Sequence, residues 1–162
     1  MGNILRQLFF KNKTDNLLGI DIGTGAVKLA EIIRLQGRPL LKSAAMVDLP
    51  DHVIDDGGSV TDEQQLADAL KKLVTTGGAH CRQAVVAVGG RTIYVREVTF
   101  PPMSNEELRE AIKWDIEKYV PYEPGAYYHD FAVVSGGANR EDMKVLLVAA
   151  PQATIQAIVA AV

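Results

Sequence analysis

The chain has 162 residues, of which 48% are hydrophobic and 23% charged, and its formal net charge at pH 7 is −3. This composition is typical of a globular protein, and without a basic patch nucleic acid is not expected as a partner. The single cysteine, Cys81, cannot form an internal disulfide, and the 3 histidines lack metal-ligand spacing, so a disulfide scaffold and a histidine metal centre are not expected.

Residues 1–15 form a leader in front of the first predicted strand. Its apolar residues fall mostly on one face of a helix, so a short amphipathic helix is one interpretation. They are Ile4, Leu5, Leu8, Phe9 and Phe10. The run is too short for a signal peptide or a membrane span. Docking onto protein and weak contact with a membrane surface both stay open.

The stretch 17–32 carries the most informative motif of the chain. An apolar strand ends at Asp21, a turn of small residues follows, and a second apolar run contains Lys28. The turn consists of Gly23, Thr24 and Gly25. Because these residues carry little side-chain bulk, their backbone N–H groups can face an anion. Lys28 can neutralise a phosphate, and Asp21 can hold Mg²⁺ through water.

The elements around the turn decide which phosphate loop it is similar to. The chain has no P-loop string, and the turn has neither the third glycine nor the following helix of a Rossmann loop. Residues 26–33 are rich in β-branched and small side chains, which predicts a second strand. A glycine turn between two strands resembles the first phosphate motif of actin-like and Hsp70-like ATPases. The alternative is an ordinary glycine hairpin with a chance Asp and Lys.

The rest of the first half predicts an α/β unit. Residues 39–47 are expected to form a third strand, antiparallel to the second, and residues 48–60 an exposed loop. A helix should open at Thr61 and end at the glycines of 77–78. Residues 83–88 then form another strand. Three meandering strands, a crossover helix and a fourth strand are expected of an actin-like subdomain.

The second half predicts a small α+β module. A strand at 93–100 precedes a helix with a capping box of Ser104 and Glu107. Two further strands are expected at 129–135 and 142–149, and Pro151 should start a last helix that reads as cut from something longer. One stripe of the capped helix is apolar: Leu108, Ala111, Ile112, Ile116 and Tyr119.

Two residues of the capped helix do not fit a simple core stripe. Asp115 lies within the apolar stripe, where a carboxylate is costly unless paired, and a hydrogen bond to a strand end would satisfy it. Trp114 lies among charged residues away from the stripe. It could lie against a neighbouring loop, or it could mark a docking face, since exposed tryptophans are enriched at interfaces.

Three segments together resemble the type IV pilus assembly protein PilM family. They are residues 19–24, 85–89 and 102–122, and the last is the specific one. The similarity runs from about residue 17 to 162, but it covers only the N-terminal half of a PilM-like protein. It implies that the second lobe, with the second phosphate motif and the adenine pocket, is absent.

The resemblance implies the fold and its divisions. Residues 16–90 would be the first part of an actin-like, ribonuclease H-like subdomain 1A. Residues 91–149 would be an inserted α+β subdomain 1C of the SHS2 type, and residues 150–162 a truncated helix that returns to 1A.

The resemblance also implies a role at the cytoplasmic face of the bacterial inner membrane. PilM-like proteins are adaptors of the platform behind pilus assembly and twitching motility, or of related type II secretion machines. They bind ATP with Mg²⁺ through a motif matched here by Asp21, Gly23, Thr24, Gly25 and Lys28. With one wall of the cleft, this chain should bind nucleotide weakly or not measurably, and no catalytic residue is expected in it.

The expected partner is the cytoplasmic N-terminal tail of the membrane protein PilN, together with other pilus platform proteins. An extended tail needs a strand edge and apolar pockets, which we expect between the 1C strands and their helix, or where 1C meets 1A. The candidate contact residues are Ile112, Trp114, Ile116, Tyr119 and Tyr122. Self-association is a further expectation, because an incompletely covered sheet favours it.

Two other members of the same superfamily are alternatives. An FtsA-like cell-division adaptor would share the subdomains, although residues 102–122 favour the PilM family. A small-molecule kinase would need a sugar pocket and a catalytic Asp in a second lobe, and no residue of this sequence supports it.

Overall fold

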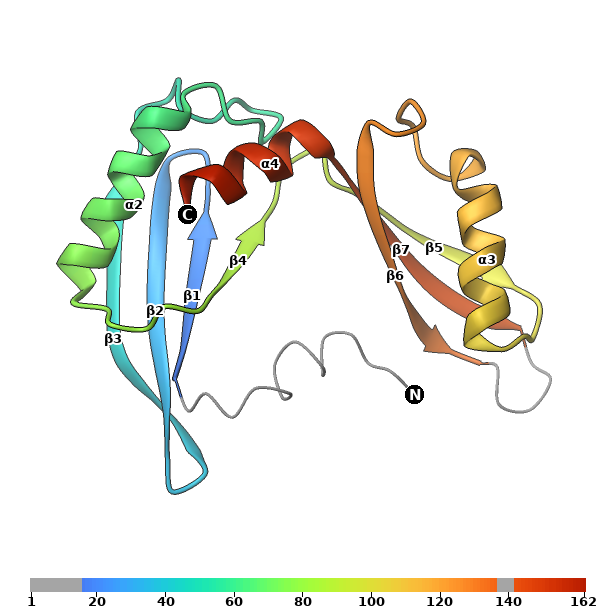
Figure 1. The fold of residues 1–162 in the computed structure, drawn as a ribbon, viewed down its shortest axis with the longest axis horizontal. Coiled ribbons are helices and arrows are strands. Elements are labelled where there is room, and N and C mark those ends of the chain that lie inside the picture. The colour runs from blue at the N-terminus through green and yellow to red at the C-terminus, as the bar shows by residue number, and fades with distance from the viewer. Residues whose placement is uncertain (1–15, 137–141) are drawn as a thin grey trace. The chain divides into compact units, whose positions relative to one another are not determined.

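The computed structural model describes residues 16–136 and 142–162 (Figure 1). The predicted leader of residues 1–15 therefore lies outside the described residues, as does most of the turn after Gly136. The described chain divides into two compact units. One contains residues 16–92 and Gln156–Val162, and the other Ile93–Ile155. The sequence places the corresponding divisions after residues 90 and 149.

The first unit is built on a four-stranded sheet with the order β3-β2-β1-β4. The strands are β1 (Asn16–Ile22), β2 (Ala26–Leu35), β3 (Arg38–Asp48) and β4 (Ala84–Val88). The first three form an antiparallel meander, and β4 pairs in parallel with β1 after the crossover helix α2 (Glu63–Gly77). Helix α4 (Gln152–Ala161) begins at the end of the second unit, and from Gln156 onward it belongs to the first (Figure 1). The predicted meander, crossover helix and fourth strand are confirmed.

One face of this sheet is buried because its strands alternate. Val27 and Leu29 are buried, whereas Lys28 between them is exposed. Leucines of α2 and one residue of α4 pack on the buried face: Leu66, Leu70, Leu73 and Ile158. Each such leucine contributes roughly 1.5–3 kcal/mol of burial free energy. The opposite face keeps large apolar side chains exposed: Ile32, Leu41, Met46 and Val85.

The segment between β3 and α2 corrects the predicted exposed loop. Leu49, Val53 and Ile54 are buried and belong to the core of the first unit. The short segment is also tied together by a bridge between Ile54 and Val60. The aspartates and glycines of this segment predict an exposed loop, but its apolar residues pack into the core of the first unit.

The cap of α2 is Asp62, so the expectation of Thr61 was wrong. The Asp62 carboxylate accepts a hydrogen bond from the Gln65 backbone N–H at 2.9 Å. The Thr61 hydroxyl instead donates to the carbonyl oxygen of His52. Bonds from Gln65 hold the pKa of Asp62 below its usual value, with the backbone N–H as the largest cause. At the other end, Gly78 takes the left-handed conformation expected of a capping glycine.

The second unit is a three-stranded antiparallel sheet with one helix on it. The strands are β5 (Tyr94–Phe100), β6 (Tyr127–Ser135) and β7 (Met143–Pro151), in the order β5-β7-β6. Helix α3 (Asn105–Asp115) continues into the short 3-10 helix η1 (Ile116–Lys118). The predicted capping box is confirmed, because the Ser104 N–H donates to Glu107 Oε2 at 2.8 Å and the Glu107 N–H donates to Ser104 Oγ at 3.2 Å. Pro151 is the last residue of β7, and the predicted last helix follows directly after it as α4.

Candidate functional site

The turn between β1 and β2 closes with few of its own hydrogen bonds. The Gly23 N–H donates to the Ala26 carbonyl at 3.0 Å, and the Gly25 carbonyl accepts from the Leu49 N–H at 2.9 Å. The N–H groups of Thr24 and Gly25 donate to no other described residue. These two amides are therefore available to an acceptor from outside the chain, as the sequence predicts for an anion-binding turn.

Asp21 and Lys28 lie directly opposite each other on β1 and β2. Lys28 Nζ is 3.0 Å from Asp21 Oδ2, and each side chain is 54% exposed. The prediction that these two groups converge around the turn is confirmed. Exposed pairs of this kind contribute little to stability, so a ligand can replace the contact at low cost.

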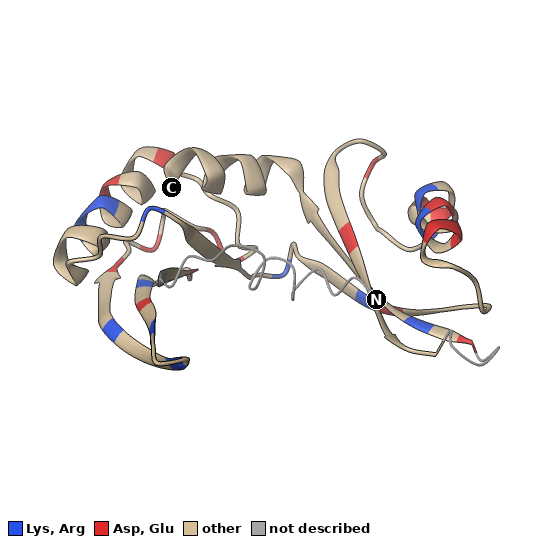
Figure 2. Cartoon of the chain, turned by 60° about the horizontal axis from the view of Figure 1, so that its bottom comes forward, with Lys and Arg blue, Asp and Glu red and all other residues tan. Residues whose placement is uncertain are grey.

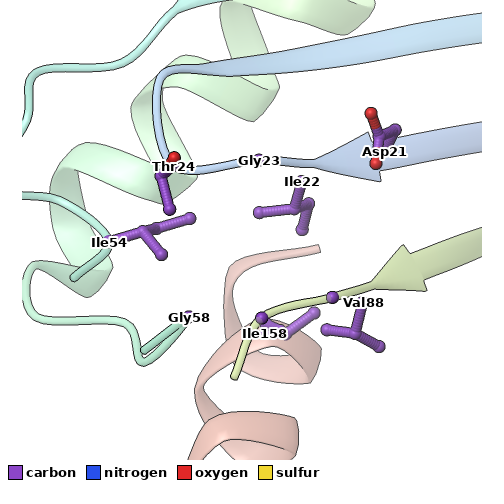
Figure 3. Close-up of a pocket in the computed structure, with 10 residues that line it drawn as sticks. Asp21, Ile22, Gly23, Thr24, Ile54, Gly58, Val88 and Ile158 are labelled. Carbon is purple, nitrogen blue, oxygen red and sulfur yellow. The ribbon is translucent and has the colours of Figure 1, made fainter. Parts of the chain in front are cut away.

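A cavity of about 200 Å³ lies beside this turn (Figure 3). It is lined by residues from β1, the β1–β2 turn, the segment after β3, the end of β4 and helix α4. They are Asp21, Ile22, Gly23, Thr24, Ile54, Gly58, Val88, Gly89, Gly90 and Ile158. The apolar side chains converge from four separate parts of the chain, and the Asp21 carboxylate lies at the β1 side (Figure 3).

Two pairs of glycines meet at one wall of the cavity. A Cβ on Gly58 would lie 2.6 Å from the Gly89 carbonyl oxygen, and a Cβ on Gly90 would lie 2.6 Å from the Gly57 carbonyl oxygen. Thr92 fixes this contact, since both its N–H and its hydroxyl donate to the Gly57 carbonyl, at 3.1 and 2.9 Å. Only glycine allows two backbones to approach this closely.

The cavity includes part of the predicted phosphate motif. Asp21, Gly23 and Thr24 line it, whereas Gly25 and Lys28 do not. The sequence predicts only a loop at 48–60 and a strand end after residue 88. The doubled glycines at 57–58 and 89–90 are a sequence signal for the close backbone contact. The apolar lining residues carry no such signal, because any buried isoleucine looks the same in sequence.

Two of the glycines around the cavity face open space. A Cβ built on Gly25 or on Gly89 would meet no atom within 4 Å, and neither residue has a positive φ. The fold itself therefore does not require glycine at these two positions. No group of three or more His, Cys, Asp or Glu that could hold a metal exists among the described residues. A single carboxylate such as Asp21 fits Mg²⁺ that is otherwise held by waters and phosphate oxygens.

The predicted partner groove between the second unit's strands and α3 is filled by core. Ile112 is 1% exposed, and Ile116 is also buried in this core. Because Ile112 and Ile116 have almost no exposed surface, they are not available to a partner. The prediction that these two residues contact the partner is therefore wrong. Tyr119 packs edge-on against Phe100, with ring centroids 6.0 Å apart.

The structural roles expected for Trp114 and Asp115 were both wrong. Trp114 is 80% exposed and does not pack against a loop. Asp115 pairs with Lys118 at 2.8 Å and not with a strand end, and this carboxylate raises the pKa of Lys118. Tyr122 is half-buried and contacts the ring of Tyr127. Trp114 is thus the predicted partner residue with the largest free surface.

No helix within the described residues is both long and apolar enough to cross a membrane.

The family model of type IV pilus assembly protein PilM matches residues 19–162. A solved structure of a PilM–PilN type IV pilus biogenesis complex matches with a TM-score of 0.81 at 27% identity, over 93% of this chain and 44% of that chain. The cytoplasmic domain of EpsL, an inner membrane component of the type II secretion system of Vibrio cholerae, matches with a TM-score of 0.53. Its identity is 15%, over 90% of this chain and 51% of that chain, so it shows a shared fold alone. This chain spans less than half the length of the PilM-related chain.

Proposed function

This chain belongs to the family of type IV pilus assembly protein PilM, and from that premise we propose a nucleotide-binding adaptor of pilus assembly. Its place would be the cytoplasmic face of the inner membrane, where PilN would hold it. The chain itself would supply one wall of an ATP·Mg²⁺ site and a surface for the cytoplasmic tail of PilN.

The observation that carries the nucleotide proposal is the Asp21–Lys28 pair beside two available amides. The amides of Thr24 and Gly25 offer hydrogen bonds to phosphate oxygens, and Lys28 offers a positive charge. Asp21 would bind Mg²⁺ through water, which transfers the role of counter-ion from Lys28 to the metal. Both side chains are half exposed, so this exchange requires little rearrangement.

One wall of a cleft makes only part of the contacts of a complete site. Since each loss of ~1.4 kcal/mol weakens binding tenfold, we expect a weak complex between this chain and ATP·Mg²⁺. We propose no hydrolysis by these residues.

The PilN proposal rests on family membership and on one exposed residue. The solved relative with a TM-score of 0.81 is a PilM–PilN complex. In this chain, Trp114 exposes a large apolar surface on α3. Charged positions of both signs lie along the same helix (Figure 2). Tryptophan is the residue type most enriched among energetic centres of interfaces, so Trp114 is our candidate for the main tail contact.

Amide chemical shifts of the ¹⁵N-labelled chain during titration with ATP·Mg²⁺ test the nucleotide site, because this method detects weak binding residue by residue. The amide chemical shifts of Thr24 and Gly25 should change as ATP·Mg²⁺ is added, and both should follow the same binding curve to saturation. The double variant Asp21→Ala/Lys28→Ala should bind at least about tenfold more weakly. The matched control is Asp68→Ala/Lys71→Ala, which removes another exposed Asp–Lys pair on α2. Equal affinity of the two double variants, or shifts confined to other segments, would refute the site.

A further inference from the structure

The end of the β2–β3 hairpin projects beyond the helix that covers the sheet. Helix α2 ends at Gly77, where an added Cβ would meet the side chains of Leu29 and Ala45. Strand β2 continues past Leu29 to Leu35, so this end of the hairpin lies beyond α2 (Figure 1). We call residues 32–42 the hairpin tip.

The hairpin tip exposes large apolar side chains. Leu35, Leu40 and Leu41 are 61%, 50% and 60% exposed. Since side chains alternate along a strand, Leu35 lies on the same face as the buried Leu29, but where α2 no longer covers that face. A group of exposed leucines at a projecting end of the molecule indicates an interaction surface.

The exposed charges of the hairpin tip are all positive. Arg34, Arg38 and Lys42 are exposed, and the segment contains no acidic residue (Figure 2). Glu31, just before the tip, is buried and accepts a hydrogen bond from Lys42 Nζ at 3.0 Å. The two arginines therefore give the tip a net positive charge, although the whole chain has a formal net charge of −3.

A tight turn holds these side chains together. Gln36 and Gly37 have φ angles of +51° and +79°, and positive φ angles of this kind suit a two-residue hairpin turn. Leu35 pairs directly with Arg38 across the two strands. Because paired residues share one face of a sheet, the tip presents apolar and basic side chains side by side.

The hairpin tip lies at the opposite end of β2 from the candidate nucleotide site. Strand β2 has 10 residues and starts at Ala26, directly after the β1–β2 turn. The tip is therefore about 30 Å from that turn. The second cleft wall that we expect in a longer PilM-related chain would face the turn, so it would leave the tip uncovered.

Residues 1–15 join the sheet beside the tip, because Asn16 pairs with Ile33. The sequence of this leader is also both apolar and basic. Positive charge on the leader and on the tip disfavours contact between them and favours an anionic partner common to both. The basic residues of the leader are Arg6, Lys11 and Lys13.

We propose that the hairpin tip binds an anionic membrane surface, with its leucines at the level of the acyl chains and its arginines at the lipid phosphates. Burial of apolar side chains and attraction to anionic lipids are the two contributions that hold a protein on a membrane surface. The inference rests on the proposed place at the cytoplasmic face of the inner membrane, since cytoplasmic leaflets carry anionic lipids. It requires neither the nucleotide site nor the PilN contact at Trp114.

Co-sedimentation with lipid vesicles tests the proposal in the whole 162-residue chain, without nucleotide or PilN. The wild type should bind vesicles of about 30% phosphatidylglycerol in phosphatidylcholine at least about tenfold more strongly than pure phosphatidylcholine, and added salt should weaken this binding. Arg34→Gln/Arg38→Gln should bind at least about tenfold more weakly, since each basic residue near an anionic surface strengthens binding roughly fivefold. The matched control Lys71→Gln/Lys72→Gln removes two exposed charges of α2 and should bind like the wild type.

A tryptophan moved to the tip locates the contact directly. In the variant Trp114→Phe/Leu35→Trp, the emission of the single indole should shift to shorter wavelength on anionic vesicles. The wild type, whose indole lies on α3, should show no such shift. Leu35→Ser/Leu40→Ser should weaken vesicle binding at unchanged charge. Circular dichroism spectra like the wild type would show that each variant is folded.

Three results would overturn the proposal. One is a wild type that does not bind anionic vesicles, and another is equal binding to anionic and to pure phosphatidylcholine vesicles. The third is equal binding by the Arg34→Gln/Arg38→Gln variant and its α2 control, because the contact would then lie outside the hairpin tip. Each of these results leaves the nucleotide and PilN experiments unaffected, because no vesicle is present in those experiments.

Discussion

Gly58 and Gly90 lie back to back, and neither position has room for a side chain. Their φ angles are +91° and +123°, in the region that favours glycine, and each would place a Cβ 2.6 Å from a carbonyl oxygen of the other pair. The two residues are far apart in sequence but together form a wall of the cavity beside the β1–β2 turn. The contact therefore joins the segment after β3 to the end of β4.

Alanine at either position should destabilise the first unit. Gly58→Ala and Gly90→Ala each combine a strained φ with a backbone clash, so we expect a loss of about 2 kcal/mol or more in unfolding free energy. Gly25→Ala is the matched control, because a Cβ there meets nothing within 4 Å. Urea unfolding followed by circular dichroism measures all three. A Gly58→Ala variant as stable as Gly25→Ala would mean that the close backbone contact does not exist in solution.

The ion pair between the buried Glu31 and the partly exposed Lys42 should respond asymmetrically to substitution. Glu31 is 0% exposed, its Oε1 is 3.0 Å from Lys42 Nζ, and its Oε2 has no partner among the described residues. Removing the cation by Lys42→Met leaves a buried carboxylate uncompensated, which should cost about 3 kcal/mol. Glu31→Met/Lys42→Met should recover most of that loss, because it removes both charges.

Lys71→Met is the control for this pair. It breaks a fully surface pair with Asp68, and its effect should stay within about 0.5 kcal/mol. The four unfolding free energies come from chemical denaturation at neutral pH. If Lys42→Met costs no more than Lys71→Met, Glu31 is not buried as described.

The cap of α3 should make the second unit sensitive to acid. Hydrogen bonds from Ser104, first from its N–H and then from its hydroxyl, lower the pKa of Glu107 below the usual 4.5. The folded state thus binds this proton less readily than the unfolded chain. The stabilisation is fully present above pH 4.5 and is lost as the pH falls through the lowered pKa.

Glu107→Gln should therefore flatten part of the fall in melting temperature between about pH 7 and about pH 3. Glu106→Gln serves as the comparison, since Glu106 lies in the same first turn and accepts no hydrogen bond from any described residue. Thermal melts in a pH series test this. Identical pH profiles for wild type and Glu107→Gln would argue against the carboxylate cap.

Trp114 should report directly on binding of the PilN tail, because it is the only tryptophan of the chain. Burial of its exposed indole by a synthetic PilN N-terminal peptide should shift its emission to shorter wavelength and protect it from a soluble quencher. Trp114→Ala should weaken peptide binding at least about tenfold. Tyr128→Ala, another exposed aromatic of the second unit, should leave the affinity unchanged. Tight binding with unchanged Trp114 emission would place the tail elsewhere.

Local patterns carried most of the correct sequence predictions. The Asp21–Lys28 pair follows from the short turn, because a hairpin of that length sets the two residues opposite each other. The Ser104–Glu107 box also needs only neighbours along the chain. In both cases the deciding contacts lie within a few residues of sequence.

The errors occurred where a distant partner decided the outcome. Val53 and Ile54 are buried because the sheet and α2 pack around them, which no local composition reveals. Ile112 was correctly placed on an apolar stripe, but a stripe does not say whether it covers the chain's own strands or another protein. At α2, Thr61 and Asp62 are both good capping residues, and a hydrogen bond to the distant His52 decides between them.

Ile158 joins the core of the first unit, yet the whole second unit separates it in sequence from Thr92. During synthesis, the ribosome must complete Ile93–Ile155 before Ile158 exists. At that point the second unit has all three of its strands, whereas the first unit still lacks Ile158, which lines the cavity. The order of translation thus favours folding of the second unit first. The cavity of the first unit is completed later, after Ile158 has been synthesised.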